Sequence, residues 1–251
     1  MKMNIYVVTH KIIDNPLPDN YSYIMVNANK TSHNYKYGDN VGDNISEKNP
    51  NYCELTAGYY IWKNDHENDI VGIAHYRRFL TTNRFSSNIK SYVNEKNICR
   101  DLKKYDFIST KPYKTKMTVK EHMGLNVREK DLVLLRKAIN EVCPDYLESY
   151  DKVVNGHQSY LLNMIITSKN NYDDYYKWLF SVLEHMEKEV DMTGYSVQEQ
   201  RLYGFLSERL FTVYVLKNNF KVKSYPTTIV GESKLKLTKN KILKKLRLKK
   251  D

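Results

Sequence analysis

The segment VGIAHYRRFL, residues 71–80, joins a short apolar run to a cluster of basic side chains. Its first four residues are typical of a buried β-strand. A helix is predicted just before it, over about residues 50–64, because Asn49 can cap the first turn and Pro50 suits the first helical position. A helix that leads through a short turn into an apolar strand is typical of an α/β sheet, so this unit constrains the fold more than any other feature.

The rest of the chain continues this alternation of strands and helices. Further strands are predicted at residues 4–9, 23–27, 105–110 and 220–230. Further helices are predicted at residues 131–142, 172–190 and 196–219. Residues 36–51, which are rich in Gly, Asn and Asp, are predicted to form a long loop of the kind that is often functional. The predicted fold class is therefore α/β, with sheet and loops in the N-terminal half and mainly helices in the C-terminal half.

The composition is that of a folded protein with one strongly basic end. The chain has 251 residues, a hydrophobic fraction of 41% and an aromatic fraction of 12%, which argue against disorder. Its net charge is +11, but residues 234–251 carry nine Lys or Arg and one Asp, which leaves only +3 for residues 1–233. A nucleic-acid-binding domain is expected to spread basic residues over a folded face, so we expect no nucleic acid partner.

The cysteines and the N-terminus indicate in which cellular compartment the protein is expected. Cys53, Cys99 and Cys143 are more than 40 residues apart and form no CxxC pair, so we expect free thiols in a reducing compartment and no structural zinc. The N-terminal apolar run is too short for a signal-peptide core, and no apolar stretch approaches a membrane span. A cytoplasmic location is therefore expected.

The strand at residues 71–74 leads directly into His75, Tyr76, Arg77 and Arg78. Ligands of open α/β sheets bind at the carboxyl ends of strands, and cations there favour an anionic ligand. Two guanidinium groups can bind such an anion in bidentate fashion. A strand end whose arginines pair with nearby acids or reach solvent is the alternative, and the residues alone leave both interpretations open.

Two other segments contain candidate binding residues. Thr9, His10 and Lys11 follow the first strand, where a base or ribose would lie in such a sheet, although a plain loop explains them equally well. In the loop GDNVGDN, Asp39 and Asp43 suit metal ligands, acceptors for ribose hydroxyls or ordinary Asx turns.

Acidic residues on the predicted helices are candidates for proton transfer. Arg201 and Glu208 are seven residues apart and therefore lie on one helix face, away from the apolar stripe. A surface ion pair of Glu208 with Arg209 is the alternative to a catalytic role. Glu54, at the start of the first helix, is explained by a favourable interaction with the helix dipole, and Trp62 is expected in the core.

Five blocks of the chain, in their order and spacing, resemble the bacterial capsule and O-antigen glycosyltransferase family once catalogued as domain of unknown function 4422. The blocks are THK at 9–11, GDNISEKNPNYCELTAGYYIWKN at 42–64, VGIAHYRRFL at 71–80, LLNMII at 161–166 and RLYGFLSERL at 201–210. The resemblance covers about residues 3–230. It implies a GT-A-like, Rossmann-type α/β fold, a nucleotide-sugar donor such as a UDP-sugar, and transfer to a growing surface polysaccharide. For characterised relatives it implies galactofuranosyl transfer.

The resemblance also implies roles for individual residues. Glu208 is the first choice for the carboxylate that takes the acceptor proton in an inverting transfer, and Asp43 is the second. The residues expected at the donor are Thr9, His10, Lys11, Asp43, Asn44, His75, Tyr76, Arg77, Arg78 and Arg209. A non-catalytic nucleotide-sugar or carbohydrate-binding module is the alternative function.

GT-A enzymes generally hold a divalent metal with an Asp-x-Asp after an apolar strand, and no predicted strand of this chain is followed by one. We therefore expect catalysis without a metal, with Mg²⁺ or Mn²⁺ as the alternative.

Residues 1–233 are predicted to form a single glycosyltransferase domain, and residues 234–251 a basic tail that is either amphipathic or disordered. Surface polysaccharides of the implied type are usually built on a lipid carrier at the inner face of the plasma membrane. Anionic headgroups there attract basic residues, so the tail favours peripheral attachment beside a lipid-linked acceptor. Residues 114–126 depart from the family pattern, which leaves the acceptor open.

Overall fold

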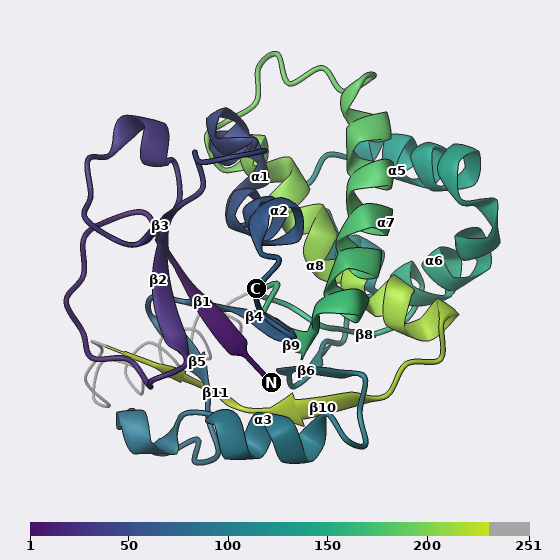
Figure 1. Ribbon diagram of the computed structural model, residues 1–251. Coiled ribbons are helices and arrows are strands. Elements are labelled where there is room, and N and C mark those ends of the chain that lie inside the picture. The colour runs from purple at the N-terminus through teal and green to yellow at the C-terminus, as the bar shows by residue number, and fades with distance from the viewer. Residues whose placement is uncertain (231–251) are drawn as a thin grey trace, which may run out of the picture.

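A twisted, mostly parallel sheet forms the centre of the molecule in the computed structural model, which describes residues 1–230 (Figure 1). Its strands and those of a small second sheet are β1 (Met3–Thr9), β2 (Tyr21–Met25), β3 (Tyr37–Gly38), β4 (Ile70–His75), β5 (Arg78–Leu80), β6 (Phe107–Thr110), β7 (Tyr113–Lys114), β8 (Gln158–Ser159), β9 (Ile165–Ser168), β10 (Val222–Tyr225) and β11 (Thr227–Ile229). The helices are α1 (Asn49–Tyr52), α2 (Leu55–Asn64), α3 (Glu95–Asp101), α4 (Val119–Met123), α5 (Glu129–Val142), α6 (Leu147–Val154), α7 (Lys169–Glu187) and α8 (Leu202–Lys217). The basic tail expected at residues 234–251 lies outside the described residues.

The strand order of the large sheet is β10-β6-β9-β4-β1-β2-β3, and the hairpin strand β5 pairs with β4 and β11. Strand β1 is parallel to both of its neighbours, β2 and β4. Because the chain passes from β1 to β2 on one side and later returns to β4 on the other, the sheet has a topological switch point at β1. Ligands of open α/β sheets bind at such a point, outside the carboxyl ends of the strands.

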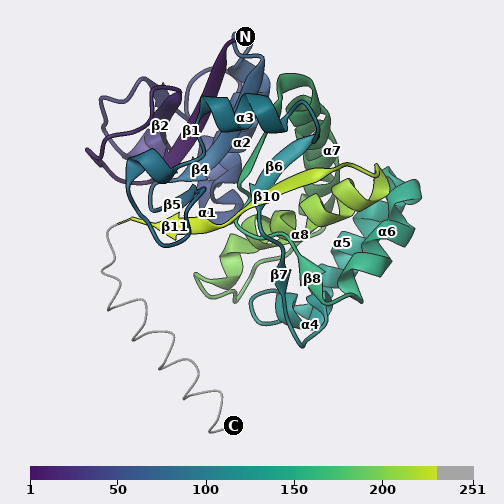
Figure 2. The ribbon, with the colours of Figure 1, turned by 90° about the horizontal axis from the view of Figure 1, so that it is seen from below.

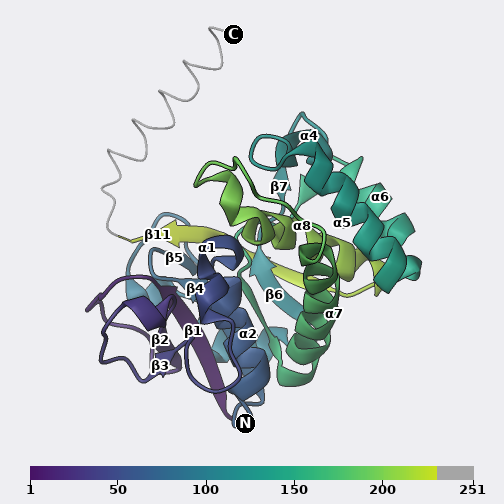
Figure 3. The ribbon, with the colours of Figure 1, turned by 90° about the horizontal axis from the view of Figure 1, so that it is seen from above.

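Alternating residues of the strands supply two cores, one on each face of the sheet. Tyr6 and Val8 of β1 pack with the buried faces of α2, α7 and α8, whereas Ile5 and Val7 pack with the opposite core, which includes Ile98 of α3. Figure 3 shows α1, α2, α7 and α8 over one face, and Figure 2 shows α3 over the other. The period-2 alternation of a strand therefore produces a sheet that is covered on both sides.

The α/β class predicted from the sequence is confirmed, and so are the strands predicted at residues 4–9, 23–27 and 105–110. The strand predicted at 220–230 is two strands, β10 and β11, separated by Pro226. Helices α5 and α7 correspond to the helices predicted at residues 131–142 and 172–190. The helix predicted over 196–219 begins only at Leu202, after a single 3₁₀ turn.

Strand β9 lies in the middle of the sheet, antiparallel to both β4 and β6, and the sequence did not predict it. It has four residues and no periodicity of its own. Its place depends on Gly72 of β4, where a Cβ atom would lie 2.6 Å from Ile166 Cγ1 and 2.8 Å from the Ile165 carbonyl oxygen. A residue without a side chain therefore lets β9 approach, and a pairing of this kind is not encoded in either strand alone.

Asp39 is fully buried and joins the loop after β2 to helix α2. Its carboxylate accepts hydrogen bonds from the backbone N–H groups of Asn27 and Ala28, at 3.0 and 3.1 Å. The hydroxyl groups of Ser46 and Thr56 donate to it at 2.5 and 2.6 Å. Both carboxylate oxygens are thus occupied by the protein itself. Asp39 is a structural residue of this loop, and the metal-ligand and ribose interpretations of it are not supported.

We expect Asp39→Ala to lower the free energy of unfolding by about 2–4 kcal/mol, because four donors would lose their buried acceptor. Urea denaturation followed by circular dichroism would measure it. The matched control is Asp14→Ala, since Asp14 is exposed, and that change should stay within about 0.5 kcal/mol. Equal stability of the two variants would contradict a structural role for Asp39.

Within residues 1–230, none of the helices has the length and apolar character needed to span a membrane.

Candidate functional site

A cavity of about 530 Å³ opens at the carboxyl ends of β1, β2 and β4, which is the position that the topology of the sheet predicts. Its lining residues come from these strand ends, from the α1–α2 junction, from the loop before β9 and from the start of α8. They are Val8, Thr9, His10, Val26, Asn49, Pro50, Cys53, Glu54, His75, Tyr76, Arg78, Leu162, Val197, Gln200, Arg201 and Glu208. Six of these, Thr9, His10, His75, Tyr76, Arg78 and Glu208, are among the residues that the sequence predicted.

The turn after β1 contributes Thr9 and His10 to the cavity. The buried Thr9 hydroxyl donates to the Lys11 carbonyl oxygen at 2.6 Å and so fixes the turn. The His10 ring meets the Tyr76 ring edge to face, with 5.2 Å between centroids, and Lys11 Nζ lies 5.1 Å from the Tyr76 ring centroid. Lys11 thus contacts a lining residue without lining the cavity itself.

The HYRR segment is a tight hairpin between β4 and β5. His75 ends β4 and pairs with Arg78, which begins β5, and the turn between them holds Tyr76 and Arg77. His75, Tyr76 and Arg78 line the cavity, whereas Arg77 does not. The structure therefore places Arg78 on the cavity wall but not Arg77, a difference that the sequence does not predict.

The loop before β9 orients three side chains of the cavity. Leu162 and Asn163 both have left-handed backbones, with φ of 79° and 50°, and such non-glycine conformations cluster at functional sites. The Leu162 N–H donates to Glu208 Oε1 at 2.9 Å, and its carbonyl oxygen accepts from His75 Nε2 at 2.6 Å. Asn163 Nδ2 donates to Glu54 Oε1 at 2.8 Å. One strained loop thus fixes His75, Glu208 and Glu54 together.

The continuous helix predicted over residues 50–64 is wrong, because the chain breaks between α1 and α2. Cys53 has a φ of 54°, and this left-handed residue ends α1. The break places Cys53 and Glu54 on the cavity wall. Cys53 Sγ accepts from Arg201 Nε at 3.3 Å, and burial raises the pKa of the thiol to about 11, so it is protonated at neutral pH.

Helix α8 supplies the charged pair Glu208 and Arg209. The buried Arg209 guanidinium donates to the Glu208 carboxylate and to the Phe205 carbonyl oxygen, and Nη2 lies 3.0 Å from His122 Nδ1. Arg209 does not line the cavity, so it acts on the site through Glu208. Burial raises the pKa of Glu208, while the positive charge of Arg209 opposes this effect.

Asp43 and Asn44 lie outside the cavity. Asp43 accepts from the Tyr59 hydroxyl at 3.1 Å and lies 3.9 Å from Lys63 Nζ, in the second half of α2. Asn44 accepts from the Ser46 N–H and donates to the Gly42 carbonyl oxygen, which is an ordinary turn arrangement. The structure therefore does not bring these two residues to the other candidates, and Asp43 is not placed to act as the base in this cavity.

Several lining residues were missed or set aside by the sequence analysis. Arg201 was noted only for its spacing to Glu208, and both residues do face the cavity. Glu54 was explained by the helix dipole, yet it lines the cavity beside Cys53. Glu54 reaches the cavity wall because the helix breaks at Cys53, and no local pattern in the sequence reveals this break.

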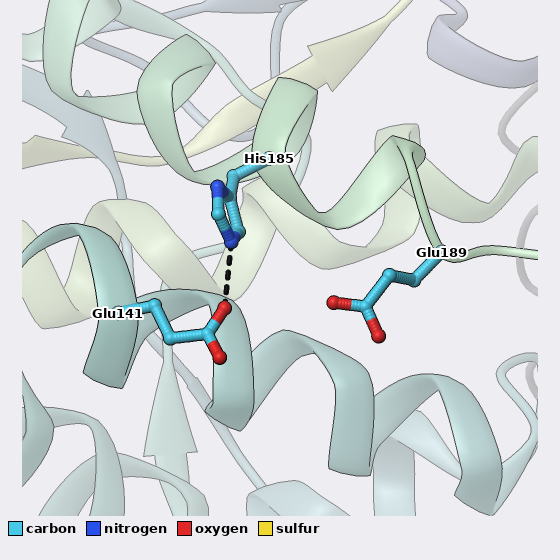
Figure 4. A group of neighbouring side chains, drawn as sticks. All are labelled: Glu141, His185 and Glu189. Carbon is cyan, nitrogen blue, oxygen red and sulfur yellow. Dashed lines mark hydrogen bonds and ion pairs between the residues drawn. The ribbon is translucent and has the colours of Figure 1, made fainter.

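Within residues 1–230, the group with metal-ligand spacing is Glu141, His185 and Glu189, whose ligand atoms lie within 4.8 Å of one another (Figure 4). None of the three residues lines the candidate cavity. His185 Nε2 is 2.7 Å from Glu141 Oε2, and Lys137 Nζ is 2.7 Å from Glu189 Oε2 and 3.9 Å from Glu141 Oε1. The lysine ammonium pairs with both carboxylates, so the group is explained as a surface ion-pair network.

Comparisons with known proteins identify the family and a similar fold. The model of the family described as "Domain of unknown function (DUF4422)" matches residues 4–219. The fold is similar to the apo structure of WbbM, described as a bifunctional glycosyltransferase, with a TM-score of 0.83 and 28% sequence identity. That match covers 92% of this chain and 46% of the WbbM chain, so this chain spans about half the length of WbbM. A search of curated proteins gave no match.

The similarity to WbbM confirms the expected GT-A-like α/β fold. The family match extends over most of the chain, from β1 to the end of α8. The chain therefore belongs to the DUF4422 family.

Proposed function

We propose that this chain is a glycosyltransferase that moves a sugar from a nucleotide-sugar donor to a glycan acceptor. The observation that carries the proposal is the cavity at the switch point of the sheet, in which Arg78 and Arg201 lie together with the half-buried carboxylate of Glu208. Cations suit a diphosphate, and a carboxylate in the same cavity suits proton transfer. The similarity to a bifunctional glycosyltransferase supports the same reaction class.

The donor is proposed to be a UDP-sugar, with galactofuranose as the sugar that the family resemblance suggests. Its nucleoside lies against Thr9 and His10 at the end of β1, and its diphosphate lies against Arg78 and Arg201. Burial, together with the charges of Lys11 and Arg201, lowers the pKa of His10, so this ring is neutral at pH 7 and suits a hydrogen bond to the nucleotide.

The reaction that fits these groups is a single displacement with inversion. An acceptor hydroxyl oxygen attacks the anomeric carbon of the sugar, and the bond from that carbon to the diphosphate oxygen breaks. The electron pair leaves with the nucleoside diphosphate, whose growing charge Arg78 and Arg201 stabilise. Glu208 takes the proton of the acceptor hydroxyl, a role for which a raised pKa is favourable.

A panel of UDP-sugars tests this function. Purified protein is incubated with UDP-galactofuranose, UDP-galactopyranose, UDP-glucose or UDP-N-acetylglucosamine, and both thermal stabilisation and UDP release are measured. We expect stabilisation by UDP and by at least one of these sugars, and slow UDP release that a glycan acceptor accelerates. The absence of both effects for UDP and for all four donors would refute the proposal.

We expect the transferase activity to survive chelation. Arg78 and Arg201 supply positive charge at the position where a metal would neutralise the diphosphate. The rate of UDP release in excess EDTA should therefore stay within about twofold of the untreated rate, since no Lewis acid is removed. Loss of activity in EDTA and its recovery with Mn²⁺ would show that a metal is needed.

The acceptor is proposed to be a capsular or O-antigen polysaccharide on a lipid carrier, with the enzyme held at the inner face of the plasma membrane by residues 234–251. Eight net positive charges in that segment should attract anionic lipids.

The full chain is expected to co-sediment with anionic liposomes at low salt and to be released at high salt. A chain that ends at Ser233 should not bind, while it still transfers sugar to a soluble acceptor. Equal binding by the shortened chain would refute the tether.

A further inference from the structure

The cavity contains two carboxylates as well as its cations. Glu54 and Glu208 both line it, and both are fixed by the loop before β9, through Asn163 and Leu162 respectively. The negative charge of Glu54 also contributes to the raised pKa of Glu208, after the larger effect of burial. One part of the cavity wall is therefore anionic.

The cations of the cavity lie on other elements. Arg78 belongs to the hairpin after β4, and Arg201 precedes α8 and bonds to Cys53. Arg201 lines the cavity, and its positive charge contributes to the lowered pKa of His10. A diphosphate is repelled by two carboxylates and attracted by guanidinium groups. The part of a donor that can lie against the anionic wall is the uncharged, hydroxyl-rich sugar.

Glu54 is held by only one of its two oxygens. Asn163 Nδ2 donates to Oε1 at 2.8 Å, and Asn163 is itself held by Ser207 Oγ at 2.9 Å. Within residues 1–230, Glu54 Oε2 has no hydrogen-bond partner and Glu54 forms no ion pair. A carboxylate that is oriented through one oxygen and open at the other is suited to accept a hydrogen bond from a hydroxyl group.

We propose that Glu54 binds the transferred sugar, by accepting a hydrogen bond from one of its hydroxyl groups at Oε2, and that Asn163 is the positioning residue that orients Glu54. This inference rests on the proposed function and assigns Glu54 to recognition of the sugar, while Glu208 serves the proton transfer. A site that is built to hold a hydroxyl group by a hydrogen bond discriminates against ligands that lack this group. Glu54 therefore contributes to the preference of the site for a UDP-sugar over UDP.

The experiment compares UDP with the four UDP-sugars named above by isothermal titration calorimetry on the full chain. The wild type is expected to bind at least one UDP-sugar more tightly than UDP. Glu54→Gln should weaken binding of that UDP-sugar by about tenfold, because a charged hydrogen bond becomes a neutral one, and should leave the Kd for UDP within about twofold. Glu47→Gln is the matched control, since Glu47 is an exposed glutamate outside the cavity and should change neither value.

A second variant tests the positioning role. Asn163→Gly removes the donor to Glu54 while it keeps a residue that adopts a positive φ without strain. We expect the KM for the UDP-sugar to rise about tenfold with a smaller change in kcat, whereas a general loss of structure would lower the melting temperature and affect UDP binding equally. This variant also tests the proposal if Glu54→Gln does not fold.

Three results would overturn the inference alone. They are an unchanged preference for the UDP-sugar in Glu54→Gln, an equal loss of UDP binding in that variant, and a wild type that binds UDP and all four UDP-sugars with the same affinity. A wild-type chain that binds neither UDP nor any of the four sugars would refute the proposed function, and the inference with it.

Discussion

Replacing Glu208 with Gln is expected to lower the rate of sugar transfer by about 10²–10⁴-fold, because a positioned general base contributes about that factor. Gln can still accept the Leu162 N–H, so the loop before β9 keeps its anchor. It cannot take the proton of an acceptor hydroxyl. Donor affinity should therefore change by less than about threefold, since the lost interaction belongs to the transition state. Rates of UDP release at saturating donor, together with calorimetric binding of the UDP-sugar, would measure the two effects.

The control for this variant is Glu148→Gln, a change of an exposed glutamate on α6, which should leave both quantities unchanged. Glu208→Gln also leaves the buried Arg209 without its carboxylate, so its thermal stability has to be measured in parallel. A stable variant that transfers sugar at the wild-type rate would exclude Glu208 as the base. A wild type that binds donor and never transfers would favour a non-catalytic binding module.

The pH dependence of transfer gives a second test of Glu208. Burial raises the pKa of Glu208, and the charge of Arg209 offsets part of this rise. A general base acts in its ionised form, so kcat should fall as the pH drops through this raised pKa. The acid limb of the pH–rate profile is therefore expected above the ordinary glutamate pKa of about 4.3. A rate that is independent of pH down to that value would contradict the assignment.

Arg78→Ala is expected to cost on the order of 2–4 kcal/mol of transition-state stabilisation, as the loss of one charge-stabilising donor does in other sites. The guanidinium lies on the cavity wall at the start of β5, where it can neutralise charge on the departing diphosphate. Both kcat/KM for the donor and the affinity for UDP should fall. Steady-state kinetics and UDP titration would measure them.

The adjacent Arg77 offers a control that the sequence alone does not suggest. Arg77 and Arg78 are both exposed, but Arg77 does not line the cavity. Arg77→Ala should therefore keep kcat/KM within about threefold of the wild type, after correction for any change in stability. Equal losses of kcat/KM in the two variants would contradict a special role of Arg78 on the cavity wall. Near-normal kinetics in both variants would indicate that the arginines of the HYRR segment have no role in catalysis.

Local sequence patterns predicted a large part of the fold and the location of the candidate site. The apolar runs of β1, β4 and β6 specify strands because burial on both faces of a covered sheet requires apolar residues. The spacing of Arg201 and Glu208 predicted that both share one side of the last helix; Arg201 lies just before α8, and both residues line the cavity. The prediction of a site after β4 depended on the same kind of local information, since polar residues at the end of a buried strand are visible in the sequence.

Only the tertiary structure decided which of the candidates come together. The insertion of β9 beside Gly72 brings Leu162 and Asn163 to the cavity, and these residues orient Glu208 and Glu54. Contacts of this kind join residues that are far apart in the chain, so no periodicity or spacing encodes them.

The sequence by itself thus determined the α/β class, the main strands and the cationic strand end, because each depends on residues that are close to one another in the sequence. The tertiary structure decided that Asp39 is a buried anchor, that Asp43 lies outside the cavity and that Glu54 lies on its wall. A carboxylate looks the same in the sequence in all three positions. Its role is set by burial and by the hydrogen-bond donors that the completed fold places around it.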